Sequence, residues 1–139
     1  MITLLNEYYR IDNIEADDND TLFGIALLPG YGAYAGHFPG NPVSPGVCNI
    51  QMIKECAERL AGKRLFLAAI TRCRFSAVLT PPVSAPSSPQ TSSSLRLRMR
   101  LLEAEGRYKT VATLYDDMVT YMEFKGELIE FKEELTTAQ

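Results

Sequence analysis

Apolar and polar residues alternate with different periods along this chain, and the changes of period mark the elements that we expect. Residues 7–15 and 21–28 are two extended segments that flank the polar cluster 17–20. Asp and Asn in that cluster favour a turn because their side chains bond their own backbone. This part of the chain therefore predicts a β-hairpin.

A helical period replaces the extended pattern between Ser44 and Gly62. Ser44 followed by Pro45 is typical of a helix start, and Gly62 is placed to end the helix. Asn49 is the one polar residue that intrudes on the apolar side of this helix. The apolar residues cover about half of the helical wheel, and they are Ile50, Met52, Ile53, Cys56, Ala57, Leu60 and Ala61.

Charged residues on the other side of this helix are spaced to pair with one another. Lys54 and Glu58, and likewise Glu55 and Arg59, are opposite charges four residues apart. Each such pair contributes about 0.3 kcal/mol to helix stability. Most of this polar surface therefore needs no functional explanation.

Strand patterns dominate the second half of the chain. In residues 95–101 Leu and Met alternate with arginine, so the apolar side chains face a core and the arginines face the other way. The candidate strands are 64–75, 95–103, 107–116 and 118–131.

Polar pairs supply the turns between the last three of these strands. Glu105-Gly106 and Asp116-Asp117 separate them, which predicts an antiparallel meander. One helix and about six strands predict an α+β domain with the helix laid against one sheet face. Because a second face and two sheet edges remain uncovered, a homodimer is favoured over a monomer.

Two segments are too rich in Gly, Pro or Ser for regular structure. Residues 29–46 hold five of the nine glycines and four of the eight prolines, which predicts a tightly shaped loop. Residues 80–94 contain ten Pro or Ser and no charged residue, so we expect a long loop there. This loop is either a mobile lid or a disordered connection between strands, and a disordered connection is the favoured interpretation.

Composition limits the classes of function. A chain of 139 residues with 46% apolar and 22% charged residues predicts one globular domain, residues 1–139. A net charge of −3 argues against a nucleic-acid partner. No apolar stretch is long enough to span a membrane, and the start lacks the pattern of a secretory signal, so we expect a cytoplasmic protein.

The chain has a single histidine, His37, which lies in the Gly/Pro-rich loop. Proton transfer near neutral pH would therefore involve His37. The three cysteines, Cys48, Cys56 and Cys73, show no metal-ligand spacing, so no metal site and no cofactor are expected. A Cys48/His37 nucleophile is conceivable at the start of the helix, but a small buried thiol is the favoured interpretation.

The segment GHFPGNPVSPGV, residues 36–47, closely resembles the active-site loop of the (3R)-hydroxyacyl-acyl-carrier-protein dehydratases. The signature of that family runs GHFPGxPxxPGV into a helix. A second, weaker similarity to the family is Arg74-Phe75 followed by Val78 and Pro81, although this chain has Pro82 where the family has glycine. The resemblance implies the hot-dog fold, in which an antiparallel sheet wraps around one central helix.

The resemblance also implies the chemistry of a site. His37 matches the catalytic histidine of the family, and the amide of Gly46 matches the group that receives the thioester oxygen. Phe38, Gly46 and Val47 are then expected to bind substrate. The implied substrate is a thioester of acyl carrier protein or coenzyme A in fatty-acid or related lipid or polyketide synthesis.

One position departs from the family pattern. The family has Glu or Asp fourteen residues after the histidine, and this chain has Gln51. An amide can donate and accept hydrogen bonds but cannot give a proton to a leaving group, and a lost general acid typically costs about 10²–10⁴ in rate. Glu55 lies one turn further along the helix and would reach the site only if the site were shifted by about 5.4 Å.

Three functions therefore stay open. The first is a 3-hydroxyacyl thioester dehydratase with His37 as base, the helix N-terminus as oxyanion site and Gln51 positioning a hydroxyl or water. The second is a non-catalytic hot-dog subunit that binds acyl chains or carrier protein and pairs with an active dehydratase. The third is an acyl-thioester hydrolase, the other common chemistry on this fold.

Partner assembly and surface charge leave alternatives as well. The protein is expected to be a homodimer, a trimer of dimers or a heteromer with a related subunit. Arg96, Arg98 and Arg100 form a row that would suit the acidic surface of acyl carrier protein. A solvated outer strand face is the favoured interpretation of that row.

Overall fold

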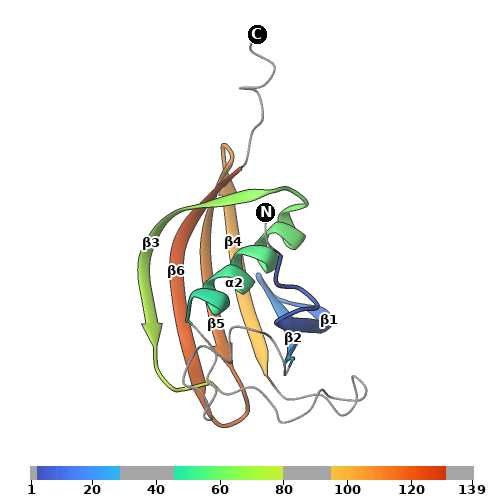
Figure 1. Cartoon of the computed structure of the whole chain (residues 1–139). Helices are drawn as coiled ribbons and strands as arrows, with labels where there is room; N and C mark the ends of the chain where they lie inside the picture. Colours follow the sequence, from blue (N-terminus) through green and yellow to red (C-terminus); the bar gives the residue numbers. More distant parts are fainter. Residues whose placement is uncertain (1–2, 29–45, 80–94, 131–139) are drawn as a thin grey trace.

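The computed structural model describes residues 3–28, 46–79 and 95–130, and these ranges form one sheet and one helix (Figure 1). Ser44, Pro45 and the 80–94 loop lie outside the described residues. The elements are β1 (Tyr9–Asp17), β2 (Asp20–Leu27), α2 (Gly46–Ala61), β3 (Leu65–Phe75), β4 (Arg96–Ala104), β5 (Arg107–Tyr115) and β6 (Thr120–Glu130).

The six strands form a single antiparallel sheet in the order β1-β2-β4-β5-β6-β3. The predicted hairpin is β1-β2, and the predicted meander is β4-β5-β6. β3 follows the helix in sequence but pairs with β6 at the far edge of the sheet. Figure 1 shows the sheet curving around α2, with β3 and β1 at its two edges. The predicted α+β arrangement is confirmed.

The tight turns follow the local sequence closely. Asp18 has a φ of 56° between β1 and β2, and Glu105 and Gly106 have φ of 55° and 80° between β4 and β5. Two successive residues with positive φ match the right-handed twist of a hairpin. The side chain of Asp116 accepts hydrogen bonds from the Met118 and Val119 amides at the next turn. These turns keep the strands in the register that points one apolar face at the helix.

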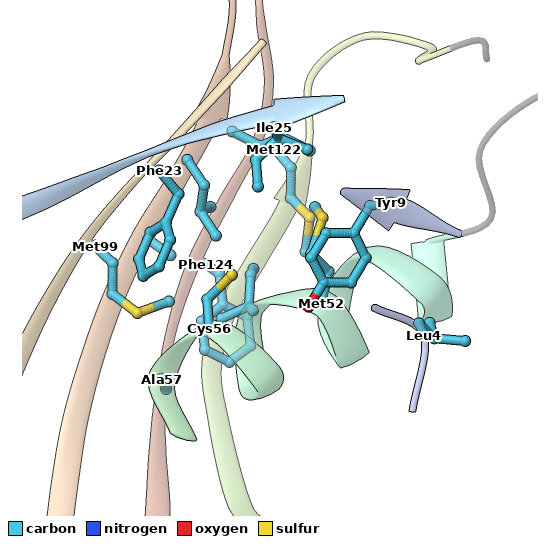
Figure 2. Packing of buried hydrophobic residues seen from close by; sticks show 14 of the residues in the cluster. Leu4, Tyr9, Phe23, Ile25, Met52, Cys56, Ala57, Met99, Met122 and Phe124 are labelled. Atoms are coloured by element: carbon cyan, nitrogen blue, oxygen red, sulfur yellow. The ribbon is translucent and has the colours of Figure 1, made fainter. Parts of the chain in front are cut away.

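The core lies between the concave face of the sheet and α2. The alternation in 95–101 is confirmed, because Leu97 and Met99 are buried and the intervening arginines point away from the helix. Gly62, with a φ of 69°, ends the helix as expected. Figure 2 shows the labelled residues of this core, among them Phe23, Ile25, Met99, Met122 and Phe124 on the sheet and Met52, Cys56 and Ala57 on the helix.

β3 is an edge strand with unusual exposure. Its hydrogen bonds to β6 skip a residue twice, between Leu67 and Ala69 and between Ile70 and Arg72, which gives the strand two bulges. Ile70 pairs in register with the inward-facing Gly126, yet its side chain is 44% exposed. The helix therefore covers only part of the apolar side of this strand.

The arginine row on β4 carries ion pairs with neighbouring aspartates. Arg98 contacts Asp17 and Asp20 at 2.9 Å each, and Arg100 contacts Asp20 at 2.7 Å. Arg96 contacts Asp117 at 2.6 Å. These contacts neutralise much of the row and favour the interpretation as a solvated outer face.

Candidate functional site

Three of the five predicted site residues lie on the first turns of α2. Gly46 is the first described residue of the helix, Val47 follows it with 75% of its surface exposed, and Gln51 lies just over one turn further on. His37 and Phe38 lie outside the described residues. The structure therefore bears on the helical half of the predicted site.

The ring of Phe75 lies against Gly46. A Cβ atom at position 46 would lie 2.8 Å from Cζ of Phe75, which is closer than real Cβ atoms come, and 3.0 Å from its Cε1, which is a tight contact. The two residues border a cleft of about 250 Å³, whose other walls include Val78, Leu79 and Tyr121. The absence of a side chain at Gly46 thus makes room for an aromatic ring in the wall of a largely apolar cleft.

Asn49 faces the same cleft from the next turn of the helix. Its side chain is buried, and its Oδ1 accepts a hydrogen bond of 2.6 Å from the hydroxyl of Tyr8, which is also buried. A buried amide is costly unless it is hydrogen-bonded, so this contact explains how the polar residue on the apolar side is tolerated. It also ties the segment before β1 to the helix.

Gln51 donates a hydrogen bond of 2.9 Å from Nε2 to Oε2 of Glu55. The prediction that Glu55 pairs with Arg59 is wrong, because the Glu55 side chain points toward the N-terminal segment instead. Its two carboxylate oxygens accept hydrogen bonds from the amides of Leu4 and Leu5 and from the hydroxyl of Tyr9. The other expected pair, Lys54 with Glu58, is present at 3.1 Å.

Gly46 and Gln51 open onto different clefts. Five residues along a helix turn the side chain by about 140°, so the two positions cannot share a face. Gln51 lines a cleft of about 330 Å³ together with Thr3, Leu5 and Glu55. Within one chain, the described residues do not bring the helix start and the Gln51 side chain into one cavity.

The two cysteines of α2, Cys48 and Cys56, are both buried. Burial raises the pKa of Cys48, and it raises the pKa of Cys56 to about 12. A thiol with a raised pKa is a poor nucleophile at neutral pH because little thiolate is present. The two helix cysteines are therefore small buried side chains, as the favoured interpretation predicts.

Several residues that shape the two clefts were not singled out by the sequence. Tyr8 and Tyr9 are both fully buried, and burial followed by the neighbouring Cys56 and Glu55 raises the pKa of Tyr9 far above its ordinary value. The only local signal was a pair of aromatic residues next to a polar turn. Their partners lie more than forty residues away in the chain, and no short motif encodes such a distance.

The described ranges, residues 3–28, 46–79 and 95–130, contain neither a metal-binding cluster nor a helix that could span a membrane. No group of three or more His, Cys, Asp or Glu side chains in these ranges is placed to hold a metal ion. No helix in them is long and apolar enough to cross a membrane.

A curved antiparallel sheet wrapped around one helix, with a cleft at the first turn of that helix, defines a hot-dog protein. Residues 13–110 match a family model described as ApeI-like, ApeI dehydratase. Since this match spans most of the chain, the chain belongs to the ApeI-like dehydratase family. The predicted hot-dog fold is thereby confirmed.

Curated relatives with the name 3-hydroxyacyl-acyl-carrier-protein dehydratase FabZ share parts of the sequence. The protein of Geobacillus thermodenitrificans is 31% identical over 96 residues, which are 62% of this chain and 59% of that protein. The protein of Lactiplantibacillus plantarum is 40% identical over 55 residues, 34% of this chain and 37% of that protein. The chain thus spans between about a third and three fifths of the length of these two relatives.

Solved structures resemble the whole described fold. The dehydratase heterocomplex ApeI:P from Xenorhabdus doucetiae contains a chain that matches with a TM-score of 0.66 at 21% identity, covering 85% of this chain and 95% of that chain. An uncharacterized protein from Erwinia carotovora subsp. atroseptica matches with a TM-score of 0.53 at 18% identity, covering 84% and 88%. At 21% and 18% identity, these similarities show a shared fold and nothing further.

Proposed function

We propose that this protein dehydrates 3-hydroxyacyl thioesters in fatty-acid or related lipid or polyketide synthesis. The observation that carries the proposal is the position of Gly46, at the first described turn of α2 and in the wall of a largely apolar cleft. Amides at a helix N-terminus have no partner within the helix and favour negative charge. They suit the oxygen of a thioester whose acyl group enters the cleft.

The reaction that follows uses one histidine twice. His37 removes the proton from C2, and the negative charge that develops on the thioester oxygen is held by the Gly46 amide. The C3–O bond then breaks, and the hydroxyl leaves as water with the proton that His37 carries. The products are an enoyl thioester and water, and we assign Phe38 and Val47 to binding of the acyl thioester.

Gln51 fills the place of a general acid but serves as a hydrogen-bonding group. Its amide can hold the C3 hydroxyl or a water in position, although it cannot supply the proton. This assignment explains why a chain with one histidine and no carboxylate at position 51 still carries the loop of a dehydratase.

The test is an assay of the purified protein with two substrates. A 3-hydroxyacyl thioester is followed by enoyl absorbance, and a plain acyl thioester is followed by release of free thiol. We expect enoyl product that disappears in His37→Ala. Thiol release without enoyl product would instead support an acyl-thioester hydrolase and overturn the dehydratase.

A second candidate function is a non-catalytic subunit that pairs with an active dehydratase. Two observations favour it: position 51 is an amide, and the structure that resembles this chain with a TM-score of 0.66 is a dehydratase heterocomplex. A folded protein that is silent in both assays, and that raises the activity of a dehydratase partner chain above the activity of that partner alone, would favour this function.

The proposed assembly is a homodimer joined along β3. Among the described residues β3 is the outermost strand on its side of the sheet, and Leu67, Ile70 and Phe75 on its concave side are each more than a third exposed. A second copy would cover both features. Because Gly46 and Gln51 open onto different clefts, the dimer also offers a way for one copy to bring Gln51 to the Gly46 cleft of the other.

Larger assemblies and the thioester carrier are further parts of the proposal. A heteromer with a related subunit would use the same β3 edge, whereas a trimer of dimers would need a further surface outside this edge. The carrier is acyl carrier protein or coenzyme A, and parallel assays with both thioesters distinguish them. The expected cytoplasmic location agrees with either carrier.

A further inference from the structure

The carboxylate of Glu55 gathers four hydrogen-bond donors. Its Oε2 accepts from the Leu4 amide at 2.7 Å and from Nε2 of Gln51 at 2.9 Å. Its Oε1 accepts from the Tyr9 hydroxyl at 2.8 Å and from the Leu5 amide at 3.1 Å. A carboxylate has about four lone-pair positions, so this one is fully occupied. Glu55 is therefore held from both the N-terminal segment and its own helix.

This arrangement fixes the orientation of the Gln51 amide. An ionised carboxylate only accepts hydrogen bonds, so the NH₂ end of Gln51 must face Glu55. The carbonyl Oε1 of Gln51 is then turned away from Glu55, and Gln51 is one of the residues that line the 330 Å³ cleft. We infer that Glu55 is a positioning residue that makes Gln51 present a hydrogen-bond acceptor to a hydroxyl group.

The inference rests on the proposed dehydratase function and gives position 51 a specific task there. In the proposed dimer, where Gln51 of one copy reaches the Gly46 cleft of the other, this acceptor takes the hydrogen of the C3 hydroxyl, so that the hydroxyl oxygen keeps its lone pairs free for the proton from His37. Without Glu55 the amide could rotate and present its NH₂ group to the hydroxyl. Gln51 would then lose this orientation, although its chemical nature would be unchanged.

Glu55 also determines what a carboxylate at position 51 would do. In Gln51→Glu two carboxylates would meet where the 2.9 Å hydrogen bond now lies, and like charges so close disfavour each other's ionised forms. The exchange Gln51→Glu with Glu55→Gln avoids this conflict, because the amide at position 55 can donate to the carboxylate at position 51. The NH₂ group of the new amide at position 55 would then also face the backbone N–H of Leu4. Two donors cannot bond each other, so the hydrogen bond from Leu4 is lost.

The first experiment does not depend on activity. In ¹⁵N-labelled protein the side-chain amide signal of Gln51 is assigned by its absence in Gln51→Ala, and its hydrogen exchange is measured. We expect exchange to become about tenfold faster in Glu55→Ala, because a hydrogen bond to a charged group is lost. The matched control is Tyr9→Phe, which removes another donor from the same carboxylate and should leave the Gln51 signal in place. Equal exchange in wild type and Glu55→Ala would overturn the inference.

The second experiment measures kcat and KM with a 3-hydroxyacyl thioester. We expect Glu55→Ala to lower kcat about tenfold with a smaller change in KM, as when a group that acts in the transition state is misplaced. Lys54→Met, which breaks the neighbouring Lys54–Glu58 pair on the same helix, is the control and should keep the wild-type kcat. Gln51→Glu should be slower than the exchange variant Gln51→Glu/Glu55→Gln.

The two possible failures give different results. If wild-type protein makes no enoyl product, the dehydratase proposal fails, while the exchange measurement still decides whether Glu55 orients Gln51. If wild-type protein is active and folded Glu55→Ala keeps its kcat, the positioning role is overturned and the dehydratase proposal stands.

Discussion

The hydroxyl of Tyr8 donates a hydrogen bond of 2.6 Å to Oδ1 of Asn49, and both side chains are buried between the N-terminal segment and the helix. Removing the hydroxyl in Tyr8→Phe leaves a buried amide oxygen without this donor. We expect a loss of about 1–2 kcal/mol in the free energy of unfolding, measured by urea denaturation. A double-mutant cycle with Asn49→Ala should give a coupling of about 1 kcal/mol. A coupling near zero would contradict the assigned bond.

Gly46→Ala should disturb the ring of Phe75. The new Cβ would lie 2.8 Å from the ring, which must move, and overpacking typically costs about 1–3 kcal/mol. Because Phe75 is 54% exposed and can shift, we expect the low end of this range. Thermal unfolding measures the cost. The double variant Gly46→Ala/Phe75→Ala should lose less than the sum of the two single variants, and strict additivity would argue against the contact.

Asp20→Asn should destabilise the protein in a pH-dependent way. Hydrogen bonds from Arg98, then from Arg100, hold the pKa of the Asp20 carboxyl below its ordinary value. A carboxyl with a lowered pKa stabilises the folded state above its unfolded pKa of about 3.9, and this contribution is lost as the pH falls through the folded value. At pH 7 the free energy of unfolding in urea should therefore be lower for the variant than for wild type. At pH 3 this difference should be smaller. If the difference in free energy of unfolding were the same at pH 7 and pH 3, the ion pairs of Asp20 would not be its cause.

The three cysteines should react with a thiol reagent in a fixed order. Burial raises the pKa of Cys56 to about 12, so at pH 8 almost no thiolate is present at this position. Cys73 is partly exposed and should react first in native protein, followed by Cys48. Cys56 should react only after unfolding. Cys73→Ser should remove the fast phase, and fast labelling of Cys56 would contradict the described burial.

Ile70→Lys should separate the proposed dimer into monomers. The side chain lies on the concave side of β3 and is 44% exposed in a single chain, so a second copy that covers it would have to bury the lysine charge. Sedimentation analysis gives the oligomeric state. Val111→Lys, an exposed apolar position away from β3 on β5, is the control and should leave the assembly unchanged.

A site shared between two copies makes a further prediction for mixed dimers. His37→Ala and Gln51→Ala should each be impaired alone. Random exchange of equal amounts gives mixed dimers in half of the population, each with one complete site, so about a quarter of wild-type activity should return. No recovery after verified subunit exchange would show that each chain holds its own complete site.

Local sequence patterns determined most of the secondary structure. The alternation in 95–101 decided which side chains face the core, because successive residues of a strand point to opposite faces. Glu105-Gly106 determined a hairpin turn, and Gly62 determined the end of the helix, because each supplies a positive φ that the backbone needs there. The loop motif around His37 also indicated a hot-dog dehydratase, which agrees with the ApeI-like family match.

Charge spacing alone was a poorer guide than the turns. Lys54 and Glu58 pair as their spacing predicts. Glu55 does not pair with Arg59, because it accepts hydrogen bonds from two backbone amides and a tyrosine hydroxyl instead. An exposed pair four residues apart gains only a few tenths of a kcal/mol. Such a pair is easily replaced when tertiary packing brings several donors to one carboxylate.

The tertiary structure decided which distant residues meet. β3 lies beside β6, Phe75 lies against Gly46, and Glu55 binds a segment about fifty residues earlier in the chain. A local period determines which face of an element is apolar, but not which other element covers that face. The sequence by itself thus determined the elements, the family and the candidate site residues of this protein. Only the folded chain decided that Gly46 and Gln51 open onto different clefts and that Glu55 orients the Gln51 amide.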